Sequence, residues 1–148
     1  MTALETAFAS ISRLALDSSP IIYFVEAHPR YDALVTTIFQ RIAEGQIEGI
    51  TSTLTLTEVL ALPMEKGQHD LCQTYRKLLT SAAHFTLVSI GSEIAERAAE
   101  LRARYHLRTP DALQVAAALL NDCQAFLTND KGLSRITEVE VLVLEALL

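Results

Sequence analysis

The chain has 148 residues, half of them hydrophobic, which fits one folded domain with a sizeable core and excludes a disordered polypeptide. Its formal net charge of −6 argues against general nucleic-acid affinity through the overall field, but allows a local basic groove or an acidic site filled by cations. No apolar run approaches the roughly 20 residues of a membrane span, and the N-terminus lacks the basic start of a signal peptide. We therefore expect a cytoplasmic protein that does not enter a membrane.

Helical and strand-like patterns alternate along the chain. Apolar residues at helical spacing predict helices over residues 2–10, 31–44, 69–83, 92–105 and 109–119. Residues 21–25 follow Ser19 and Pro20 and can start a helix, which we favour, although by propensity they can also form a strand. Apolar runs rich in β-branched and aromatic residues predict strands over residues 13–16, 48–52, 85–90, 125–130 and 139–144. Such alternation predicts right-handed crossovers and a mainly parallel sheet covered on both faces, in a single domain that spans residues 1–148.

One further helix is expected to open after the second strand. Thr55 and Glu58 fit the Thr-x-x-Glu capping box, in which Glu58 would be the third helical residue. Pro63 and Gly67 are expected to close this segment. The capping box explains Glu58 without any functional site.

The segment from Thr109 to Leu119 is apolar almost all round, with Gln114 as the one polar break after its first turn. Such a helix should be buried on most sides. Thr109 is a good N-cap, and Pro110 suits the first helical position because its missing N–H costs nothing there. Asp111 then lies in the first turn, where the helix dipole favours a carboxylate. An acidic residue thus stands at the start of a buried helix, as a dipole partner or as part of a site.

Four acidic residues occupy positions that can share one edge of the sheet. Ligands of parallel sheets gather at the carboxyl ends of the strands, where Asp17 and Asp130 follow or end strands and Glu58 opens a helix entered from a strand. Asp111 reaches that edge only if its helix, which follows another helix, docks with its N-terminus there. Taken singly, each residue is also explained as a turn, cap or dipole residue.

Carboxylates gathered in this way would raise one another's pKa unless cations compensate them. Oxygen ligands alone suit a hard ion such as Mg²⁺ or Mn²⁺, and no His or Cys at these positions suggests zinc. Such ions complete their shell with water and phosphate oxygens, so the expected chemistry is phosphodiester hydrolysis. Arg108 and Lys131 flank the acidic positions and are candidates for holding RNA phosphates, with solvated surface charge as the alternative.

Four segments in this order resemble the PIN domain: LALDSSPIIYFVEAHPRY, TLTEVL, RTPDALQVAAALL and FLTNDKGL. This is the fold of the ribonuclease toxins of VapBC-type toxin–antitoxin pairs, and the resemblance runs from Leu14 to Leu144. It implies a three-layer α/β/α sandwich around a parallel sheet. The helix expected at residues 2–10 is an addition before the usual compact start of such toxins.

The resemblance also implies roles for particular residues. The catalytic carboxylates that ligate Mg²⁺ or Mn²⁺ would be Asp17, Glu58, Asp111 and Asp130. Thr128 matches a small hydroxyl residue that orients a carboxylate, and Ser18 matches a small polar position beside the first aspartate. Family members commonly form homodimers and, as toxins, are neutralised by a small antitoxin protein.

The sequence thus predicts a metal-dependent endoribonuclease, the toxin of a type II toxin–antitoxin pair. Two alternatives stay open at this point. One is a catalytically weak PIN-like binding module, against which the presence of all four acids counts. The other is a different Mg²⁺-dependent phosphohydrolase with an acidic site, although the sequence Asp17-Ser18-Ser19 lacks the second acid of the Asp-x-Asp setting that such enzymes use.

Overall fold

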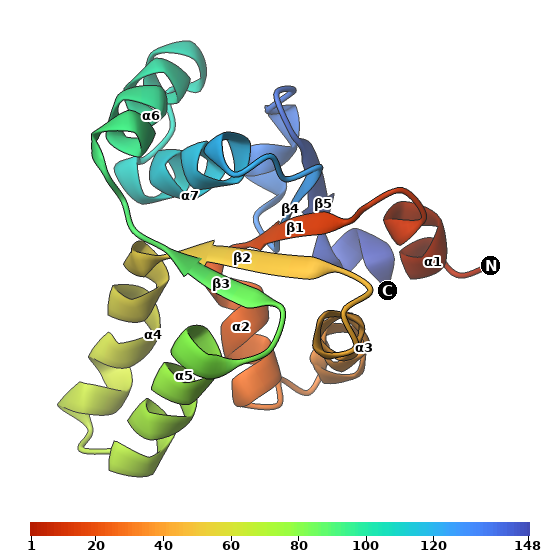
Figure 1. Ribbon diagram of the computed structural model, residues 1–148, viewed down its shortest axis with the longest axis vertical. Helices are drawn as coiled ribbons and strands as arrows, with labels where there is room; N and C mark the ends of the chain where they lie inside the picture. The colour runs from red at the N-terminus through yellow and green to blue at the C-terminus, as the bar shows by residue number, and fades with distance from the viewer.

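The computed structural model describes residues 1–148, and its centre is a sheet of five strands in the order β3-β2-β1-β4-β5 (Figure 1). The strands are β1 (Arg13–Leu16), β2 (Glu48–Ser52), β3 (Phe85–Val88), β4 (Ala125–Thr128) and β5 (Glu140–Val143). Every neighbouring pair is parallel, which confirms the predicted sheet. Strand β1 lies in the middle, so the residue that follows it leaves the sheet at the centre of its carboxyl edge.

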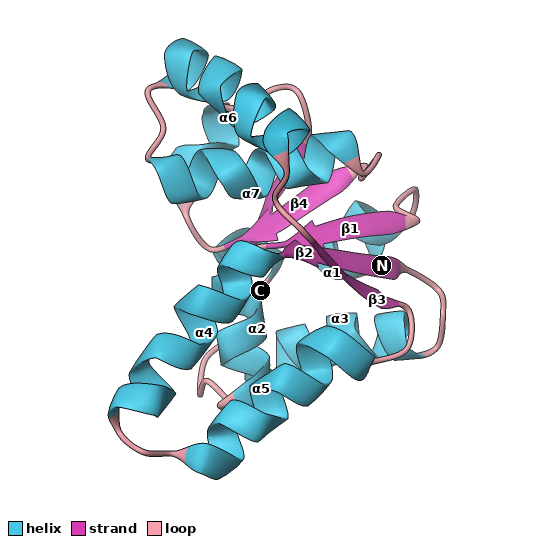
Figure 2. Cartoon of the chain, turned by 60° about the vertical axis from the view of Figure 1, so that its left-hand side comes forward, coloured by secondary structure: helices cyan, strands magenta, loops and turns pink.

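Helices cover both faces of the sheet and give the predicted three-layer sandwich. They are α1 (Ala3–Phe8), α2 (Ser18–Val25), α3 (Asp32–Ala43), α4 (Thr53–Glu65), α5 (His69–Ser81), α6 (Ser92–Tyr105) and α7 (Thr109–Leu120), with 3₁₀ turns η1 (Lys131–Arg135) and η2 (Leu144–Leu147). Figure 2 shows α6 and α7 on one side of the sheet and α2 to α5 on the other. None of these helices combines the length and the apolar character that crossing a membrane requires.

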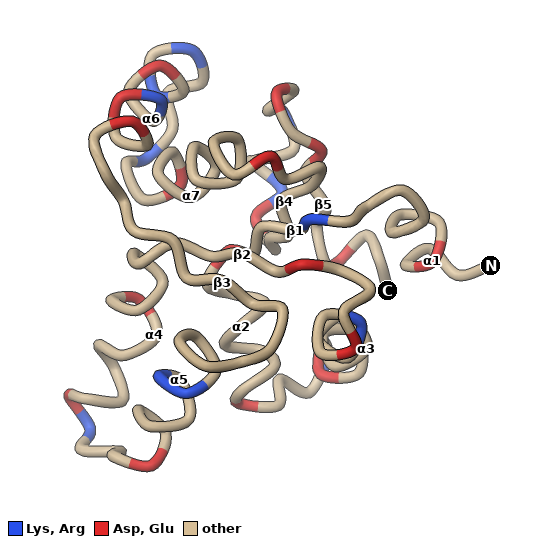
Figure 3. The backbone as a smooth tube through the Cα atoms, viewed as in Figure 1, with Lys and Arg blue, Asp and Glu red and all other residues tan.

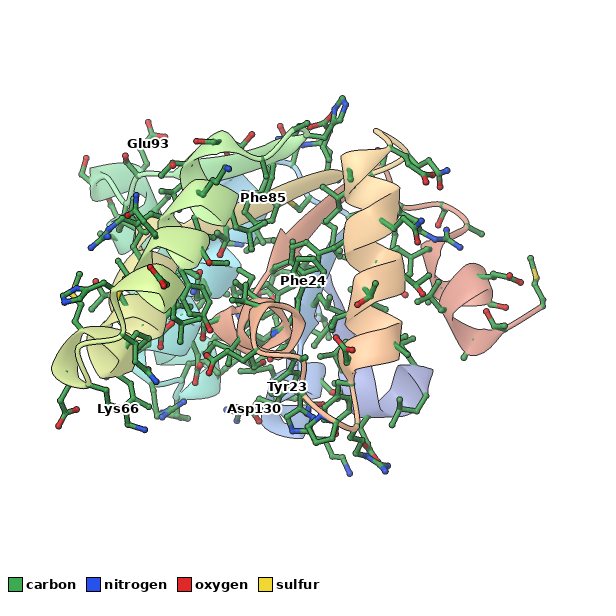
Figure 4. The ribbon with its side chains drawn as sticks, turned by 90° about the horizontal axis from the view of Figure 1, so that it is seen from below. Tyr23, Phe24, Lys66, Phe85, Glu93 and Asp130 are labelled. Carbon is green, nitrogen blue, oxygen red and sulfur yellow. The ribbon has the colours of Figure 1, made fainter.

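Two apolar cores form because successive residues of a strand point to opposite faces of the sheet. In β1, Leu14 and Leu16 pack into the core shared with α1 to α5, while Ala15 packs into the core shared with α6 and α7. Figure 4 views the molecule from the side of the sheet covered by α2 to α5, where Phe24 and Phe85 lie. The small residues of α7 let that helix lie close against the sheet, and they fix where its N-terminus can sit.

The additional N-terminal helix predicted at residues 2–10 is present as α1. Thr2 and Glu5 form a capping box, with each side chain accepting a hydrogen bond from the other residue's backbone N–H at 3.1 Å. Leu4 and Phe8 are buried against the first core. This extension therefore completes the hydrophobic packing at the amino edge of the sheet.

The capping box predicted at Thr55 and Glu58 is wrong. Helix α4 begins at Thr53, directly after the last residue of β2, and Ser52 occupies the N-cap position without a side-chain cap bond. Thr55 is instead fully buried and bonded to Thr51, so it cannot cap the helix. The helix also continues through Pro63 to Glu65 before Gly67 turns the chain with φ +67°. Glu58 consequently lies beyond the first turn, and capping no longer explains it.

The start of α7 is displaced by one residue from the prediction. Arg108 holds the N-cap position and Thr109 is already helical, so Thr109 is not the cap. Asp111 nevertheless lies in the first turn, as expected. Strand β4 ends at Thr128, two residues before Asp130, because Asp130 caps η1 by accepting a hydrogen bond from the N–H of Gly132 at 2.8 Å.

Candidate active site

One hollow at the carboxyl edge of the sheet contains every residue that the sequence singled out. It has a volume of about 410 Å³, and one of its eleven lining residues is hydrophobic. The predicted residues that line it are Asp17, Ser18, Glu58, Arg108, Asp111, Thr128, Asp130 and Lys131. Asp111 reaches this edge because α7 packs on the sheet with its N-terminus there, an arrangement that the sequence alone left open. Ser19, Tyr23 and Asn129 complete the wall.

Asp17 lies at the centre of this edge, between β1 and α2. Its backbone N–H donates to the carbonyl of Leu127 at 2.9 Å, which extends the pairing with β4 by one residue. One carboxylate oxygen accepts the backbone N–H of Ser18 at 2.9 Å, and the other accepts the hydroxyl of Thr128 at 2.8 Å. Burial raises the pKa of Asp17, the bonds from Thr128 and Ser18 oppose that shift, and the charges of Glu58 and Asp111 add to it.

Thr128 links the carboxylate of Asp17 to the backbone of Asp130. Its side chain is fully buried at the end of β4. The hydroxyl donates its proton to Asp17 and accepts the backbone N–H of Asp130 at 3.1 Å. The predicted role of Thr128, orienting a carboxylate, therefore has a geometric basis. Ser18 makes its contact with Asp17 through the backbone, so its own hydroxyl is not needed for that bond.

Asp111 has a resident positive neighbour. The Nε of Arg108 lies 3.1 Å from the Asp111 carboxylate, with the arginine side chain 77% exposed and that of Asp111 14% exposed. The hydrogen bond and charge of Asp111 raise the pKa of the Arg108 guanidinium, and the charges of Asp130 and Asp17 add to this. Arg108 thus faces three of the four acids. Lys131 lines the same hollow, and its charge also acts on Glu145.

Few charged side chains lie beneath the carboxyl edge of the sheet. Figure 3 shows most Asp, Glu, Lys and Arg residues on the outer helices and loops. Helix α7, which passes under the site, carries one charged residue, Asp111. Arg108 and Lys131 are the basic residues that line the hollow beside the four acids, so a divalent cation can supply the remaining positive charge.

The donor set fits a hard divalent cation. The lining side chains offer carboxylate, hydroxyl and amide oxygens, with no His or Cys, which are the ligands that Mg²⁺ and Mn²⁺ prefer over zinc. Burial is the main cause of the raised pKa of Asp17, and the charges of Glu58 and Asp111 add to it; a bound cation would favour the ionised form against both effects. The side chains do not form a compact group of three ligands as they stand, so they must draw together around an ion.

Tyr23 and Asn129 were not predicted as part of the site. The amide N–H of Asn129 donates to the hydroxyl of Tyr23 at 3.3 Å, and Figure 4 shows Tyr23 close to Asp130. The ring of Tyr23 also stacks on Tyr31, with centroids 4.9 Å apart. A sequence signal existed for Asn129, which stands between Thr128 and Asp130. The position of Tyr23 depends on how α2 packs, which its own segment does not reveal.

The sequence of residues 14–139 matches the pattern of the PIN domain family. The chain belongs to the PIN domain family. This match covers all four acidic positions and leaves out residues 1–13 and 140–148, which include α1, β5 and η2. A sequence comparison with curated proteins found no match.

Solved structures of PIN proteins share the fold at low sequence identity. A toxin–antitoxin complex from Klebsiella pneumoniae matches with a TM-score of 0.69 at 22% identity, over 88% of this chain and 97% of that one. VapBC2 from Rickettsia felis, bound to a promoter DNA fragment, matches with a TM-score of 0.72 at 15% identity, over 88% and 98%. VapC20 of Mycobacterium tuberculosis, a Sarcin-Ricin loop cleaving toxin, matches with a TM-score of 0.65 at 16% identity, over 86% and 98%.

Proposed function

We propose that this PIN protein is a Mg²⁺- or Mn²⁺-dependent endoribonuclease that hydrolyses RNA phosphodiester bonds. One observation carries the proposal. The four acids of the PIN pattern, which are spread over more than 110 positions of the chain, line a single polar hollow at the carboxyl edge of the sheet. A binding module without catalysis has no need to gather four carboxylates in one hollow, because their mutual repulsion costs free energy.

In this proposal Asp17, Glu58, Asp111 and Asp130 hold the metal. When bound, the metal supplies Lewis-acid activation of water and of the phosphate group. Asp17 cannot turn freely, since Ser18 and Thr128 occupy one oxygen each, and it therefore presents fixed lone pairs to the hollow. A carboxylate next to the attacking water accepts its proton.

The basic residues beside the acids would bind the substrate. Arg108 and Lys131 both line the hollow and can contact phosphate oxygens of RNA. Arg108 is well placed because its guanidinium is largely exposed while it still contacts Asp111. The overall charge of −6 repels RNA at a distance, so binding depends on these local contacts.

We also propose that the protein acts in the cytoplasm as the toxin of a type II toxin–antitoxin pair. Support comes from the structures that share its fold, several of which are toxin–antitoxin complexes. A small antitoxin protein would be its partner, and a homodimer its assembly. Co-purification with the product of an adjacent small gene tests the first point, and light scattering tests the second.

Replacement of Asp111 by Asn tests the site. The variant removes one negative ligand while the helix start keeps its shape, so Mn²⁺ binding should weaken and RNA cleavage should disappear. The loss should exceed the roughly 10–100-fold that removal of an outer hydrogen-bond partner costs. Calorimetric Mn²⁺ titration and cleavage of defined RNAs measure the two effects.

Asp122→Asn is the matched control for this experiment. Asp122 is exposed just past the other end of α7 and has φ +56°, a conformation that Asn tolerates well. It should bind and cleave like the unmodified protein. Unchanged cleavage by Asp111→Asn would overturn the site assignment. Hydrolysis of a phosphomonoester without action on RNA would favour a different acidic-site phosphohydrolase.

A further inference from the structure

A buried chain of polar side chains runs beneath the acidic hollow, and Gln114 is at its centre. Gln114 is 3% exposed, and Ser52, Thr55 and Thr51 are buried with it. The hydroxyl of Ser52 lies 2.7 Å from the Gln114 amide oxygen, and the Gln114 amide nitrogen lies 2.9 Å from the Thr55 hydroxyl. No buried side-chain polar atom lacks a partner in the structure, so this chain of bonds is fully satisfied.

The orientation of the Gln114 amide follows from which group donates the proton in each of these hydrogen bonds. Thr51 must donate to the carbonyl of Leu16, 2.8 Å away, because a carbonyl only accepts. The Thr51 oxygen, 2.7 Å from that of Thr55, therefore accepts from Thr55. Thr55 has then used its only proton and must accept from Gln114. The NH₂ group of Gln114 thus faces Thr55, and the Ser52 hydroxyl donates to its oxygen.

This orientation directs the second N–H of the amide toward Glu58. The Gln114 amide nitrogen lies 3.5 Å from a carboxylate oxygen of Glu58. Gln114 also lies three residues after Asp111, on the same side of α7. The other end of the chain is the carbonyl of Leu16, the residue before Asp17. The polar chain therefore connects the three elements that carry Glu58, Asp111 and Asp17.

Packing alone does not account for a glutamine at this position. The rest of α7 beyond its first turn is apolar, and the neighbouring residues from Val115 to Ala118 are completely or almost completely buried. Burying an amide costs free energy unless every hydrogen bond is made, and a methionine here would leave the buried Ser52 hydroxyl and Thr55 oxygen without the partners that the amide supplies. The amide therefore satisfies Ser52 and Thr55, and its remaining N–H is the one donor of the buried chain that reaches an acid of the site.

We propose that Gln114 is a positioning residue that holds the carboxylate of Glu58 in register with Asp111 and Asp17. This inference rests on the proposed function, in which these three acids hold a divalent cation. The buried amide limits the rotation of Glu58 before the ion arrives, so less ordering is left to occur on binding. Outer hydrogen-bond partners of this kind affect metal affinity without touching the metal.

The test compares Gln114→Met with the unmodified full-length chain. Methionine keeps the length of the side chain and removes both hydrogen-bonding groups. The dissociation constant for Mn²⁺, measured by calorimetry or by the EPR signal of free Mn²⁺, should rise about 10-fold or more. Leu113→Met, a methionine in the adjacent, partly buried position of α7, is the matched control and should leave Mn²⁺ affinity unchanged.

A double variant separates positioning from general damage. If Gln114 acts through Glu58, then Gln114→Met should weaken Mn²⁺ binding little further in a Glu58→Gln background, so the two effects are not additive. Additive effects would indicate a merely structural role and would overturn the proposal. The conservative variant Ser52→Ala removes the bond to the amide oxygen and leaves the amide held by Thr55 alone, so it should raise the Mn²⁺ dissociation constant by a smaller factor.

The outcomes distinguish this inference from the proposed function. If the unmodified chain neither binds Mn²⁺ nor cleaves RNA, the proposed function fails. If the unmodified chain does both and Gln114→Met binds Mn²⁺ with the same dissociation constant, only the role of Gln114 fails. Should Gln114→Met not fold, Ser52→Ala decides, and unchanged Mn²⁺ affinity in that variant overturns the role of Gln114.

Discussion

Asp17 and Glu145 are two carboxylates at the same edge of the sheet with opposite electrostatic surroundings. Asp17 follows the central strand β1, and burial together with neighbouring acids raises its pKa. Glu145 follows the edge strand β5, where hydrogen bonds from Arg30 and Tyr31 lower its pKa to about 2. Its contacts to the Arg30 guanidinium are 2.5 and 3.0 Å long. Position at the carboxyl edge is therefore not enough to make a site.

The two carboxylates differ in the hydrogen-bond donors and positive charges that the protein places beside them. Glu145 has a resident arginine and a tyrosine hydroxyl, so it has no need for a soluble cation and serves to hold η2 against α3. Asp17 has hydroxyl and backbone donors but no basic partner in hydrogen-bond contact. The candidate metal site thus gathers four acids in one hollow, and of these only Asp111 forms an ion pair with a basic side chain, Arg108.

Among the variants that test the difference between Asp17 and Glu145, Thr128→Val should have the largest effect. Valine keeps the shape of the buried side chain but removes the hydroxyl that donates to Asp17 and accepts from Asp130. Mn²⁺ affinity should fall by roughly 10–100-fold, with RNA cleavage falling in parallel. Tyr31→Phe, which removes the corresponding hydroxyl from Glu145, is the control and should leave Mn²⁺ affinity unchanged. Equal losses in both variants would contradict the distinction between the two carboxylates.

A smaller effect is expected from replacing Arg108, which lies beside the site acids; Arg30, which lies beside Glu145, is its counterpart. Arg108→Ala should weaken RNA binding several-fold and make its dependence on salt shallower by about one phosphate contact. Mn²⁺ binding should persist, because no ligand is removed. Arg30→Ala should leave RNA binding and its salt dependence unchanged. Filter binding at several salt concentrations measures both, and an unaltered slope for Arg108→Ala would remove that residue from the RNA contact.

The smallest effect should appear in the pH dependence of thermal unfolding without metal. A raised pKa means that the folded chain binds the proton of Asp17 more tightly, so its contribution to stability falls as pH rises above 3.8 through the raised pKa. The contribution of Glu145 has the opposite sign: it is present above pH 4.5 and is lost as pH falls toward about 2.

Asp17→Asn and Glu145→Gln separate these two contributions. Asp17→Asn should gain melting temperature relative to the unmodified chain near neutral pH, and Glu145→Gln should lose it there. The difference for Glu145→Gln should shrink below pH 4.5, where the unmodified chain also loses the charge. Melting curves from pH 3 to 8 measure these shifts, and a loss of melting temperature in Asp17→Asn at neutral pH would contradict the assigned surroundings of Asp17.

By itself, the sequence determined the order of the elements, the parallel sheet and the family, because apolar periodicity and strand–helix alternation are local signals. It also identified Asp17, Glu58, Asp111 and Asp130, although each acid had an alternative explanation in its own segment. The false capping box at Thr55 shows the limit of such signals. Thr55 is a good cap in isolation, but the fold buries it under the site, where its hydroxyl serves Thr51 and Gln114.

Only the tertiary structure decided how these residues meet. The docking of α7 with Asp111 at the carboxyl edge depends on the packing of its small residues against the sheet, which joins segments far apart in the chain. The use of Gln114 likewise depends on partners from β2 and α4, more than fifty positions away. Hydrogen-bond partners, burial and the resulting pKa shifts are properties of such long-range neighbours. For that reason the sequence alone pointed to the acids, while the fold determined which partners surround each of them.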